Sequence, residues 1–512
     1  MPDMRRLVNK DGDVRRFPLV PMAVAVTLLI GAGAQVAAAQ TVTPTIATVQ
    51  VGDCPADGRA VPSDYLGLSI EWGMVSRWFG TSGSQVVQPM VRLLQSISQA
   101  PGVLRIGGNS EDGFTWAPDA DISGNGAFNG TISRGMVDAL FEVARQSGWS
   151  VVLGMNLRAD DPANAAALAA YVRSVDTSHR LLAFEIGNEP NAYFGTDVAG
   201  YIARVQRYVD ALDASPATAG SPITGPGLSN QADATYVTAF AQAFGSRMPF
   251  ATWHAYANRP TLTDLLDEGA TTDWVNRIAL VSAAAGAAPT RMAEGNSVGN
   301  GGLDRVSSVM GSTAWLLDTL LTGAAVGLRG YNLHSWDGYP FPAPTMTSYY
   351  TPFVIRDGAV LPTPGVYALA LARSLPGSRF CAAVTRNGVD QHVKSWAVTD
   401  ATGRHVHLYL INKGVPGHEG TVSVTAPTTR FGSVTVSRIE DPGGCAGRSS
   451  SIEGTQVPSS GRFDWAPEGV LPGPGTSTYS IYLAACQSAL VDFRPQTVKR
   501  PVRPWRPGQL LR

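Results

Sequence analysis

The stretch Leu182-Ala183-Phe184-Glu185-Ile186-Gly187-Asn188-Glu189-Pro190-Asn191 is a mostly apolar run that gives way at once to Gly, Asn and Pro. A short apolar run bounded by such turn residues is typical of a strand that is buried on both faces, as in a parallel sheet. We therefore expect a strand over residues 182–186, followed by a loop that begins at Gly187 and carries Asn188 and Glu189.

Similar apolar runs recur on both sides of this one, and helical patterns separate them. The eight expected strands lie at residues 66–70, 103–106, 151–153, 182–186, 223–224, 250–253, 290–292 and 330–333. The expected helices lie at residues 88–99, 134–147, 162–175, 198–213 and 232–244. Strand–helix repeats of this number predict an α/β fold, a (β/α)8 TIM barrel, which we expect over residues 59–375. A doubly wound open sheet is the alternative, but it needs a Gly-rich phosphate loop after its first strand, and residues 66–73 contain none.

A different pattern follows the barrel. Apolar and polar residues alternate with period two in segments at residues 393–398, 405–411, 421–425, 433–437 and 479–483. This alternation predicts a C-terminal antiparallel β-sandwich domain, which we expect over residues 376–490. Residues 45–51 alternate in the same way, so we expect the segment 40–58 to add an N-terminal strand to that sandwich. The Pro- and Arg-rich residues 491–512 are expected to form a disordered basic tail.

The composition excludes several classes of protein. Hydrophobic residues make up 44% of the chain and charged residues 15%, and the formal net charge is -1. These values are typical of a globular protein with a lightly charged surface. Nothing in this balance indicates a nucleic acid or an acidic membrane as a partner.

The first 39 residues have the features of a secretory signal peptide. Arg and Lys residues between positions 5 and 16 precede an uncharged apolar run over residues 18–34, and Ala37-Ala38-Ala39 supplies the small residues that a signal peptidase requires. We expect cleavage near Ala39 and a secreted or periplasmic protein that has no membrane span after cleavage. A retained membrane anchor is the alternative, but two glycines interrupt the run, and it is short for a span.

Four cysteines lie beyond the expected cleavage point, namely Cys54, Cys381, Cys445 and Cys486. None belongs to a CxxC pair, so a zinc cluster of cysteines is not expected. An exported protein favours disulfides, and we expect Cys445 to pair with Cys486 because both lie in the C-terminal region. Free buried thiols are the alternative.

Two glutamates follow expected barrel strands. Glu189 closes the fourth strand, and Glu294 closes the seventh in Arg291-Met292-Ala293-Glu294-Gly295-Asn296-Ser297. The carboxyl ends of barrel strands carry the active site, and strands four and seven face each other across the barrel mouth. Two carboxyl groups about 5 Å apart are the arrangement of a retaining glycoside hydrolase. We therefore predict Glu189 as acid/base and Glu294 as nucleophile; salt-bridged or solvated loop carboxylates are the alternative.

Other strand ends supply further candidates for the same mouth. Arg105 is predicted to pair with Glu294 and support the nucleophile. Trp72 is predicted to stack on a sugar ring, and Asn188 to bind the sugar 2-hydroxyl. Each candidate is otherwise a packed or solvated side chain without substrate contact. The predicted substrate-binding residues are Asn188, Glu71, Trp72, Asn109, His254, Tyr256, Asn300, Gly301 and His334.

Five pieces of the chain resemble glycoside hydrolase family 79, the β-glucuronidase and heparanase family of the clan A barrel hydrolases. They are Tyr65-Leu66-Gly67-Leu68-Ser69, Leu104-Arg105-Ile106-Gly107-Gly108-Asn109, Ile186-Gly187-Asn188-Glu189-Pro190-Asn191, Trp253-His254-Ala255-Tyr256 and Glu294-Gly295-Asn296-Ser297. Their order and spacing match over residues 60–490. The resemblance implies a retaining mechanism with Glu189 as acid/base and Glu294 as nucleophile, and an N-terminal strand that joins the C-terminal sandwich.

One departure from the family concerns the substrate. Glucuronidases of this family carry a Tyr and nearby Gly amides in the loop after the nucleophile, and these groups hold the sugar carboxylate. Here the loop is Ser297-Val298-Gly299-Asn300-Gly301-Gly302, with Gly299 where the Tyr is expected and Arg305 as the nearest cation. The amides of Asn300 and Gly301 can still bind an anion. A β-glucuronidase is therefore the first expectation, and a β-glucosidase or a diglycosidase acting on plant glycosides is the alternative.

Two further classes of protein compete with a glycosidase. A carbohydrate-binding protein on the same scaffold would not need both carboxylates, which are present. A metal-dependent hydrolase would need His and Asp at several strand ends, and His254 and His334 lack metal-ligand spacing. We therefore expect a carbohydrate substrate and no cofactor or catalytic metal.

If the signal peptide is removed as predicted, the exported protein begins close to Gln40. Expression of the full chain in a host that exports proteins, followed by intact-mass measurement of the product, checks this. A product that keeps Met1 and partitions with the membrane fraction would instead show a retained anchor.

Overall fold

The computed structural model describes residues 43–80, 87–229, 234–337, 348–426, 431–474 and 476–495. The predicted signal peptide, residues 1–39, lies outside the described residues, as does the predicted tail from residue 496 onward. No helix within the described ranges has the length and apolar character needed to cross a membrane.

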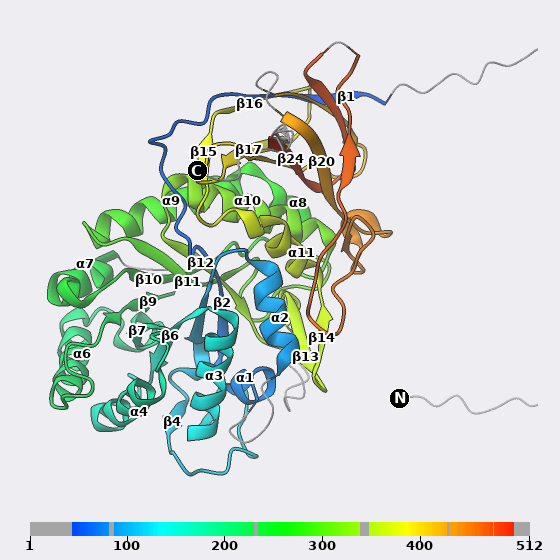
Figure 1. Cartoon of the computed structure of the whole chain (residues 1–512). Coiled ribbons are helices and arrows are strands. Elements are labelled where there is room, and N and C mark those ends of the chain that lie inside the picture. The colour runs from blue at the N-terminus through cyan, green and yellow to red at the C-terminus, as the bar shows by residue number, and fades with distance from the viewer. Residues whose placement is uncertain are drawn as a thin grey trace, which may run out of the picture. The chain divides into compact units, whose positions relative to one another are not determined.

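Parallel strands form the centre of the first domain (Figure 1). They hydrogen-bond in the order β8-β7-β6-β3-β2-β12-β11-β10-β9. Only Gly225 separates β8 from β9, and these two short strands pair with β7 and β10 respectively, so the sheet closes on itself. This confirms the predicted TIM-barrel class. The strands are β2 (Leu66–Glu71), β3 (Val103–Gly107), β6 (Ser150–Met155), β7 (Leu181–Ile186), β8 (Ile223–Thr224), β9 (Pro226–Leu228), β10 (Ala251–Tyr256), β11 (Thr290–Asn296) and β12 (Gly330–Ser335).

Helices surround the barrel strands, as Figure 1 shows. Local signals explain where several of them begin and end: the Asp161 and Asp197 side chains cap the first turns of α4 and α6, and Gly148 ends α3 with a positive φ of 83°. The helices are α1 (Trp72–Trp78), α2 (Gln88–Ile97), α3 (Arg134–Ser147), α4 (Pro162–Val175), α5 (Asn191–Phe194), α6 (Val198–Asp213), α7 (Ala234–Phe244), α8 (Leu262–Leu266), α9 (Glu268–Ala285), α10 (Met310–Val326) and α11 (Pro364–Leu371).

Short elements that the sequence pattern did not predict decorate the barrel. Two antiparallel strands form a hairpin before α11, and a small pair of parallel strands follows β3. They are β13 (Phe353–Arg356), β14 (Ala359–Pro362), β4 (Phe114–Trp116) and β5 (Gly130–Ile132).

Two sheets make the second domain. The smaller has the order β16-β1-β19-β23, in which β1 (Thr45–Val51) runs parallel to β19 and antiparallel to β16. The larger has the order β15-β17-β18-β24-β20-β21. Apolar side chains from both sheets form one core. The remaining strands are β15 (Arg379–Cys381), β16 (Ala383–Asn387), β17 (Val393–Thr399), β18 (Val406–Asn412), β19 (Gly420–Thr425), β20 (Phe431–Glu440), β21 (Ser451–Ile452), β22 (Glu468–Val470), β23 (Thr478–Leu483) and β24 (Ser488–Pro495).

The predicted start of the tail at residue 491 is wrong. Strand β24 continues to Pro495, and it lies between β18 and β20 rather than at an edge. Val491 and Phe493 point into the sandwich core and are fully buried. The apolar residues within 488–493 are the signal that predicts a strand here. The charged residues just after them make the segment resemble the tail that follows.

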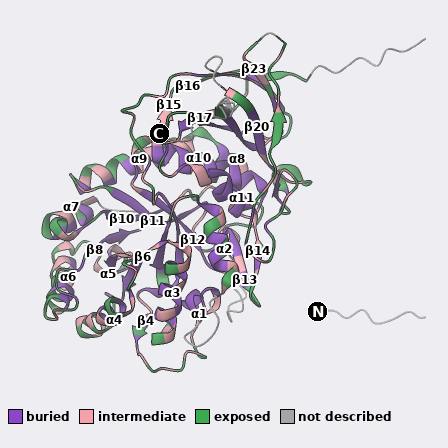
Figure 2. Ribbon diagram, viewed as in Figure 1, coloured by how far each residue is buried: buried purple, intermediate pink, exposed green. Residues whose placement is uncertain are grey.

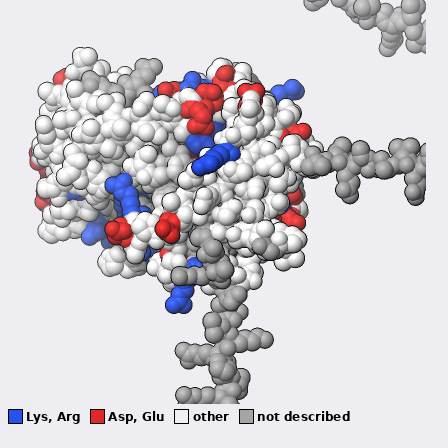
Figure 3. Space-filling model, turned by 90° about the horizontal axis from the view of Figure 1, so that it is seen from above, with Lys and Arg blue, Asp and Glu red and all other residues white. Residues whose placement is uncertain are grey.

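The larger sheet is buried on both faces, because its second face packs against the barrel. Every residue of β18 is buried, and Tyr409 and Ile411 belong to the barrel-side core whereas Leu408 and Leu410 belong to the sandwich core. Figure 2 shows this as a buried layer that runs through both domains. Charged side chains are sparse on the face shown in Figure 3, in keeping with the low charged fraction of the chain.

A buried ionic cluster joins α10 to the sandwich. The Asp318 carboxylate accepts from Lys413 Nζ at 3.0 Å and lies 2.8 Å from Lys394 Nζ, and Lys413 also contacts Glu268 at 2.9 Å. Burial acts to raise the pKa of Asp318, but the two ammonium groups outweigh it and lower the pKa.

Two disulfide bonds are present within the described part of the chain. Cys445 pairs with Cys486, which confirms that expectation, and Cys54 pairs with Cys381, across 327 residues of sequence. The second pair fixes the segment after β1 to β15. Free thiols, the alternative reading, are excluded for these four residues.

Removal of the Asp318 charge is expected to weaken the junction between the domains. Because the folded pKa is lowered, this carboxylate contributes stability above its unfolded pKa of about 3.9, and the contribution is lost as the pH falls below that value. At pH 7, Asp318→Asn should lower the free energy of unfolding by about 3–5 kcal/mol, since the buried ammonium of Lys413 and the partly buried one of Lys394 lose their buried partner and keep only the exposed Glu268. Urea unfolding from pH 7 down to pH 3 measures this, and the gap to wild type should narrow below pH 4.

Asp273→Asn is the matched control, because Asp273 pairs with Arg259 at the surface with 58% of its side chain exposed. It should cost less than about 1 kcal/mol. Equal effects of the two variants would contradict a structural role for the buried cluster.

Candidate active site

A cavity of about 250 Å³ lies at the carboxyl ends of the barrel strands. Side chains from several strand ends and their following loops line it, as expected for this fold. The lining residues are Glu71, Asn109, Phe128, Glu189, Ser229, Tyr256, Asn258, Glu294, Gly299, Asn300, Gly301, His334, Trp336 and Tyr350.

Glu294 is held rigidly at the floor of this cavity. It lies within β11 and is only 6% exposed, and its two oxygens have separate donors. Arg105 Nη1 donates to Oε2 at 2.8 Å, and the Tyr256 hydroxyl donates to Oε1 at 2.7 Å. Burial acts to raise the pKa of Glu294, but His334, His254 and Arg105 outweigh it and hold the pKa at about 2. Glu294 is therefore ionised at any pH near neutrality.

Glu189 is the more accessible of the two glutamates. It follows β7, and its φ of 46° places a non-glycine residue in the left-handed region, which is uncommon and concentrates at functional sites. A hydrogen bond of 2.9 Å from its backbone N–H to the Gly227 carbonyl supports this conformation. Its side chain is 27% exposed, and its Oε1 lies 3.1 Å from Nδ1 of His254.

The neighbours of His254 define which ring nitrogen carries the proton. Its Nε2 lies 3.4 Å from Nη2 of Arg105. A guanidinium can only donate, so Nε2 accepts, and the proton of the neutral ring sits on Nδ1 and points at Glu189. His254 therefore joins the two carboxylates: one oxygen of Glu189, one of Glu294 and a ring nitrogen of His254 all lie within 4.8 Å of one another.

Arg105 organises the layer beneath the cavity. Its guanidinium is fully buried and contacts Glu185 at 2.6 Å, Glu294 at 2.8 Å and Glu111 at 3.2 Å. Burial and the nearby charge of Glu185 raise the pKa of Glu111, so one of the three carboxyl groups can remain protonated. Gly107 makes room for this side chain, because a Cβ there would lie 2.3 Å from the Arg105 Cζ.

Sequence reasoning missed Glu111 and Glu185 as part of the site. The available signal was Glu185 itself, a charged residue inside an apolar parallel strand. Such a residue requires a buried partner.

Glu71, Asn109 and His334 form the opposite wall. The Glu71 carboxylate accepts from the backbone N–H groups of Asn109 and Ser110, at 3.2 and 2.8 Å, and its Oε1 lies 3.3 Å from Nε2 of His334. Burial acts to lower the pKa of His334, but Glu294 and Glu71 outweigh it and raise the pKa. The raised pKa favours the charged form of His334, which lines the cavity.

Three predicted substrate contacts do not line the cavity, namely Trp72, Asn188 and His254; His254 is 1% exposed and contacts Glu189 instead. The prediction for Trp72 is wrong: its side chain is fully buried in the hydrophobic core at the start of α1 and does not line the cavity. Asn188 lies behind the lining residues, 5% exposed, with its Oδ1 accepting from Arg105 Nη2 at 3.1 Å. The turn from β2 directly into α1 rotates Trp72 inward, and the residue pattern does not reveal that turn.

An aromatic group that the sequence did not reveal completes the cavity. Trp336 Nε1 donates to the Tyr350 hydroxyl at 3.0 Å, and Tyr350 in turn hydrogen-bonds Tyr256, the donor to Glu294. Tyr350 and Tyr256 stack with ring centroids 6.1 Å apart. Trp336 and Tyr350 lie after the eighth strand, outside the motifs that the sequence shows, so only the folded chain brings them next to Tyr256.

The loop after Glu294 contributes Gly299, Asn300 and Gly301 to the lining of the cavity. Asn300 and Gly301 have positive φ values of 53° and 91°, and the Gly299 N–H donates to Asn258 Oδ1 at 2.9 Å. Successive amides in such conformations form a concave anion site. Arg305 is exposed and does not line the cavity, and within the described part of the chain no Lys or Arg does.

No protein-family model and no curated protein matches the chain. Solved structures of glycoside hydrolases are similar to it. A 4-O-α-L-rhamnosyl-β-D-glucuronidase from Fusarium oxysporum 12S has a TM-score of 0.67 at 18% identity, covering 87% of this chain and 99% of its own. A GH51 arabinofuranosidase from Xanthomonas axonopodis pv. citri has 0.62 at 14%, covering 88% and 100%. A monomeric β-xylosidase from Caulobacter crescentus CB15 has 0.57 at 14%, covering 89% and 100%.

Arg105 is expected to be essential for the stability of the barrel centre. Arg105→Met leaves three carboxyl groups without their cation and should lower the free energy of unfolding by about 3–5 kcal/mol at pH 7. Arg105→Lys should recover only part of this loss, because an ammonium lacks the fork that reaches three partners. Chemical denaturation of both variants tests the expectation. Arg145→Met, which removes a surface pair with Glu142, is the control, and a loss in Arg105→Met no larger than in this control would contradict it.

Proposed function

We propose that this protein is a secreted retaining β-glycosidase that hydrolyses O-glycosidic bonds by double displacement. The observation that carries the proposal is the pair formed by Glu189 and Glu294, with oxygens within 4.8 Å of each other across a sugar-sized cavity. A separation of about 5 Å suits direct attack by one carboxylate, whereas inverting enzymes need about 6.5–9.5 Å to admit a water.

The environments of the two glutamates support different roles for them. Glu294, with two donors and a pKa of about 2, is the permanent carboxylate and attacks the anomeric carbon while the glycosidic bond breaks. Glu189, the more exposed residue, gives its proton to the departing oxygen. In the second step Glu189 takes a proton from water, the water oxygen bonds to the anomeric carbon, and Glu294 is released. The hydrogen bonds from Arg105 and Tyr256 orient the Glu294 carboxylate for attack. They weaken when this carboxylate becomes the neutral ester of the glycosyl-enzyme, so they do not hold the enzyme in that intermediate.

A β-glucuronide is the proposed substrate class. Three observations support it: Asn300 and Gly301 line the cavity, the raised pKa of His334 favours its charged form, and one similar structure is a 4-O-α-L-rhamnosyl-β-D-glucuronidase. The absence of Lys and Arg from the described lining favours the second candidate, a neutral-sugar β-glucosidase or diglycosidase. A carbohydrate-binding protein is the candidate from a different class.

The deciding experiment compares an aryl β-glucuronide with the matching aryl β-glucoside. Wild type, Glu294→Ala and the control Glu419→Ala, which removes an exposed carboxylate, are assayed on both. We expect glucuronide turnover in wild type and control, and a fall of kcat/KM by on the order of 10⁴-fold or more in Glu294→Ala, because the attacking group is lost.

Each other outcome has a definite meaning. Turnover of the glucoside alone would identify the neutral-sugar enzyme. Activity that survives Glu294→Ala would overturn the mechanism. Sugar binding without turnover, together with no covalent labelling of Glu294 by a 2-deoxy-2-fluoro glycoside, would identify a binding protein.

A further inference from the structure

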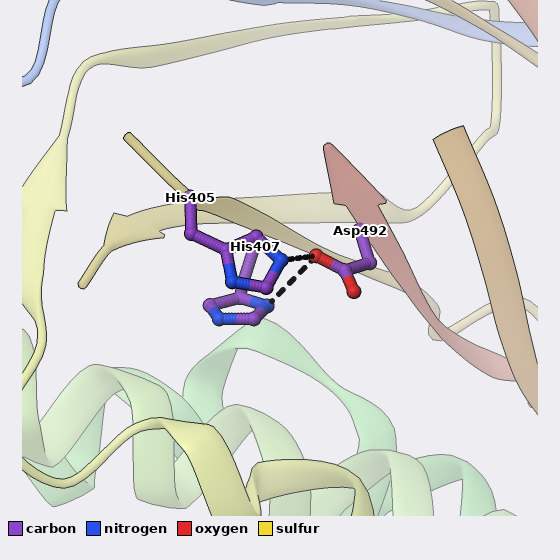
Figure 4. A group of neighbouring side chains, drawn as sticks. All are labelled: His405, His407 and Asp492. Atoms are coloured by element: carbon purple, nitrogen blue, oxygen red, sulfur yellow. Dashed lines mark ion pairs between the residues drawn. The ribbon is translucent and has the colours of Figure 1, made fainter. Parts of the chain in front are cut away.

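Three polar side chains meet on the barrel-facing side of the larger sheet, away from the cavity described above (Figure 4). His407 lies in β18 and His405 lies two residues before it, just ahead of the strand, and both point to the same face. Asp492 of the adjacent strand β24 is the register partner of His407. Sheet pairing therefore fixes two of the three side chains against each other, and His405 joins them from the turn before β18.

The three side chains aim single atoms at one point. Asp492 Oδ1 lies 2.5 Å from Nε2 of His405 and 3.4 Å from Nδ1 of His407, and the three atoms all lie within 4.8 Å of one another. Both contacts are ion pairs, drawn as dashed lines in Figure 4, and none of the three atoms makes a well-directed hydrogen bond within the described residues. The other oxygen of Asp492 is already held by Arg494 Nε at 2.9 Å, which fixes the orientation of the carboxylate.

Burial makes this arrangement costly unless something binds it. His407 and Asp492 are each 8% exposed. Buried polar atoms without a hydrogen-bond partner are rare and call for an explanation such as an ion. The two imidazole rings lie 4.5 Å apart between centroids, so both rings border the same point.

We propose that His405 Nε2, His407 Nδ1 and Asp492 Oδ1 bind one divalent transition-metal ion, with Zn²⁺ as the preferred ion. Two imidazoles and one carboxylate are a common zinc ligand set that leaves a fourth position open. A tetrahedral ion with ligands about 2.0–2.1 Å away sets its ligand atoms about 3.3–3.4 Å apart. The His407–Asp492 separation already has this value, and His405, on the turn and the least buried of the three, must move outward by less than about 1 Å.

The fourth position opens into a groove between the sheet and the barrel. Arg373, Asp400, Thr435 and Trp465 contribute to its lining together with the three ligands. The ion would connect the turn before β18 to β24 at the centre of the sheet, next to the barrel. Its expected role is to stabilise this junction, and it is separate from the glutamate pair of the proposed glycosidase.

Zinc binding by the chelator-treated, exported protein tests the proposal. We expect one Zn²⁺ per chain by calorimetry, and Co²⁺ in its place should give the visible absorption of a four-coordinate site. Zn²⁺ at a hundred times its Kd should raise the Tm by on the order of 2 °C or more. His405→Ala should weaken binding beyond the roughly 10–100-fold that loss of an outer partner causes, and should remove the Tm shift.

Three controls make the result specific. The double variant His392→Ala/His418→Ala removes another pair of neighbouring histidines, whose rings lie 6.0 Å apart, and should bind Zn²⁺ as wild type does. Glu294→Ala should also retain one equivalent, because the cluster of Glu189, His254 and Glu294 is a separate candidate for the same ion. Asp492→Asn should behave as His405→Ala, with zinc-free thermal unfolding showing that both variants are folded.

The proposal is overturned if wild type binds no Zn²⁺, if His405→Ala binds as tightly as wild type, or if Glu294→Ala alone abolishes binding. In the first case the three side chains only contact one another, as drawn in Figure 4, and hold no ion. In the last the ion belongs to the active-site cavity.

Discussion

The guanidinium of Arg105 is the interaction on which the centre of this protein depends. A fully buried cation contacts the carboxyl groups of three residues, Glu111, Glu185 and Glu294, which come from three different segments of the barrel. Each of those carboxyl groups would be costly to bury alone, and the guanidinium would be costly to bury without them. The barrel therefore closes around a set of charges that are stable only together. Gly107 is part of the same constraint, since any side chain there would displace the guanidinium.

The guanidinium of Arg105 also gives the two glutamates at the cavity different electrostatic environments. Glu294 contacts Arg105 directly and keeps its negative charge. Glu189 has a strained backbone conformation, and its side chain is linked to Arg105 through His254. Two chemically identical side chains thus acquire different electrostatic environments from their positions relative to one cation. Differences of this kind allow one carboxyl group to act as an acid while the other acts as a nucleophile.

Much of the scaffold could be read from the sequence, and the reason is periodicity. The helices 134–147, 162–175 and 198–213 have the predicted bounds, because apolar spacing and flanking caps are local signals. The two strand-end glutamates were also visible, since a polar motif after an apolar strand marks the barrel mouth. Trp72, Tyr350 and Glu111 were misplaced or missed because their positions depend on a tight turn, a late loop and a buried charge partner. The end of β24 was missed because its last residues, Asp492 and Arg494, resemble the charged tail that follows them. The positions of these residues and of the end of β24 depend on contacts between distant segments, which composition and spacing do not encode.

The position of β1 ties the beginning of the chain to its end. This strand lies between β16 and β19, with Ala47 opposite Asn387 and Thr45 opposite Thr421, and the Cys54–Cys381 bond fastens the segment that follows it. A ribosome makes β1 before the whole barrel and makes both of its neighbours after it. The strand therefore has no partners until nearly all of the chain has been synthesised, and contacts of such long range form slowly. A chain that stops before residue 420 lacks β19 and β23, so one edge of β1 has no neighbouring strand and the smaller sheet is incomplete. Completion of that sheet therefore requires segments from both ends of the described chain.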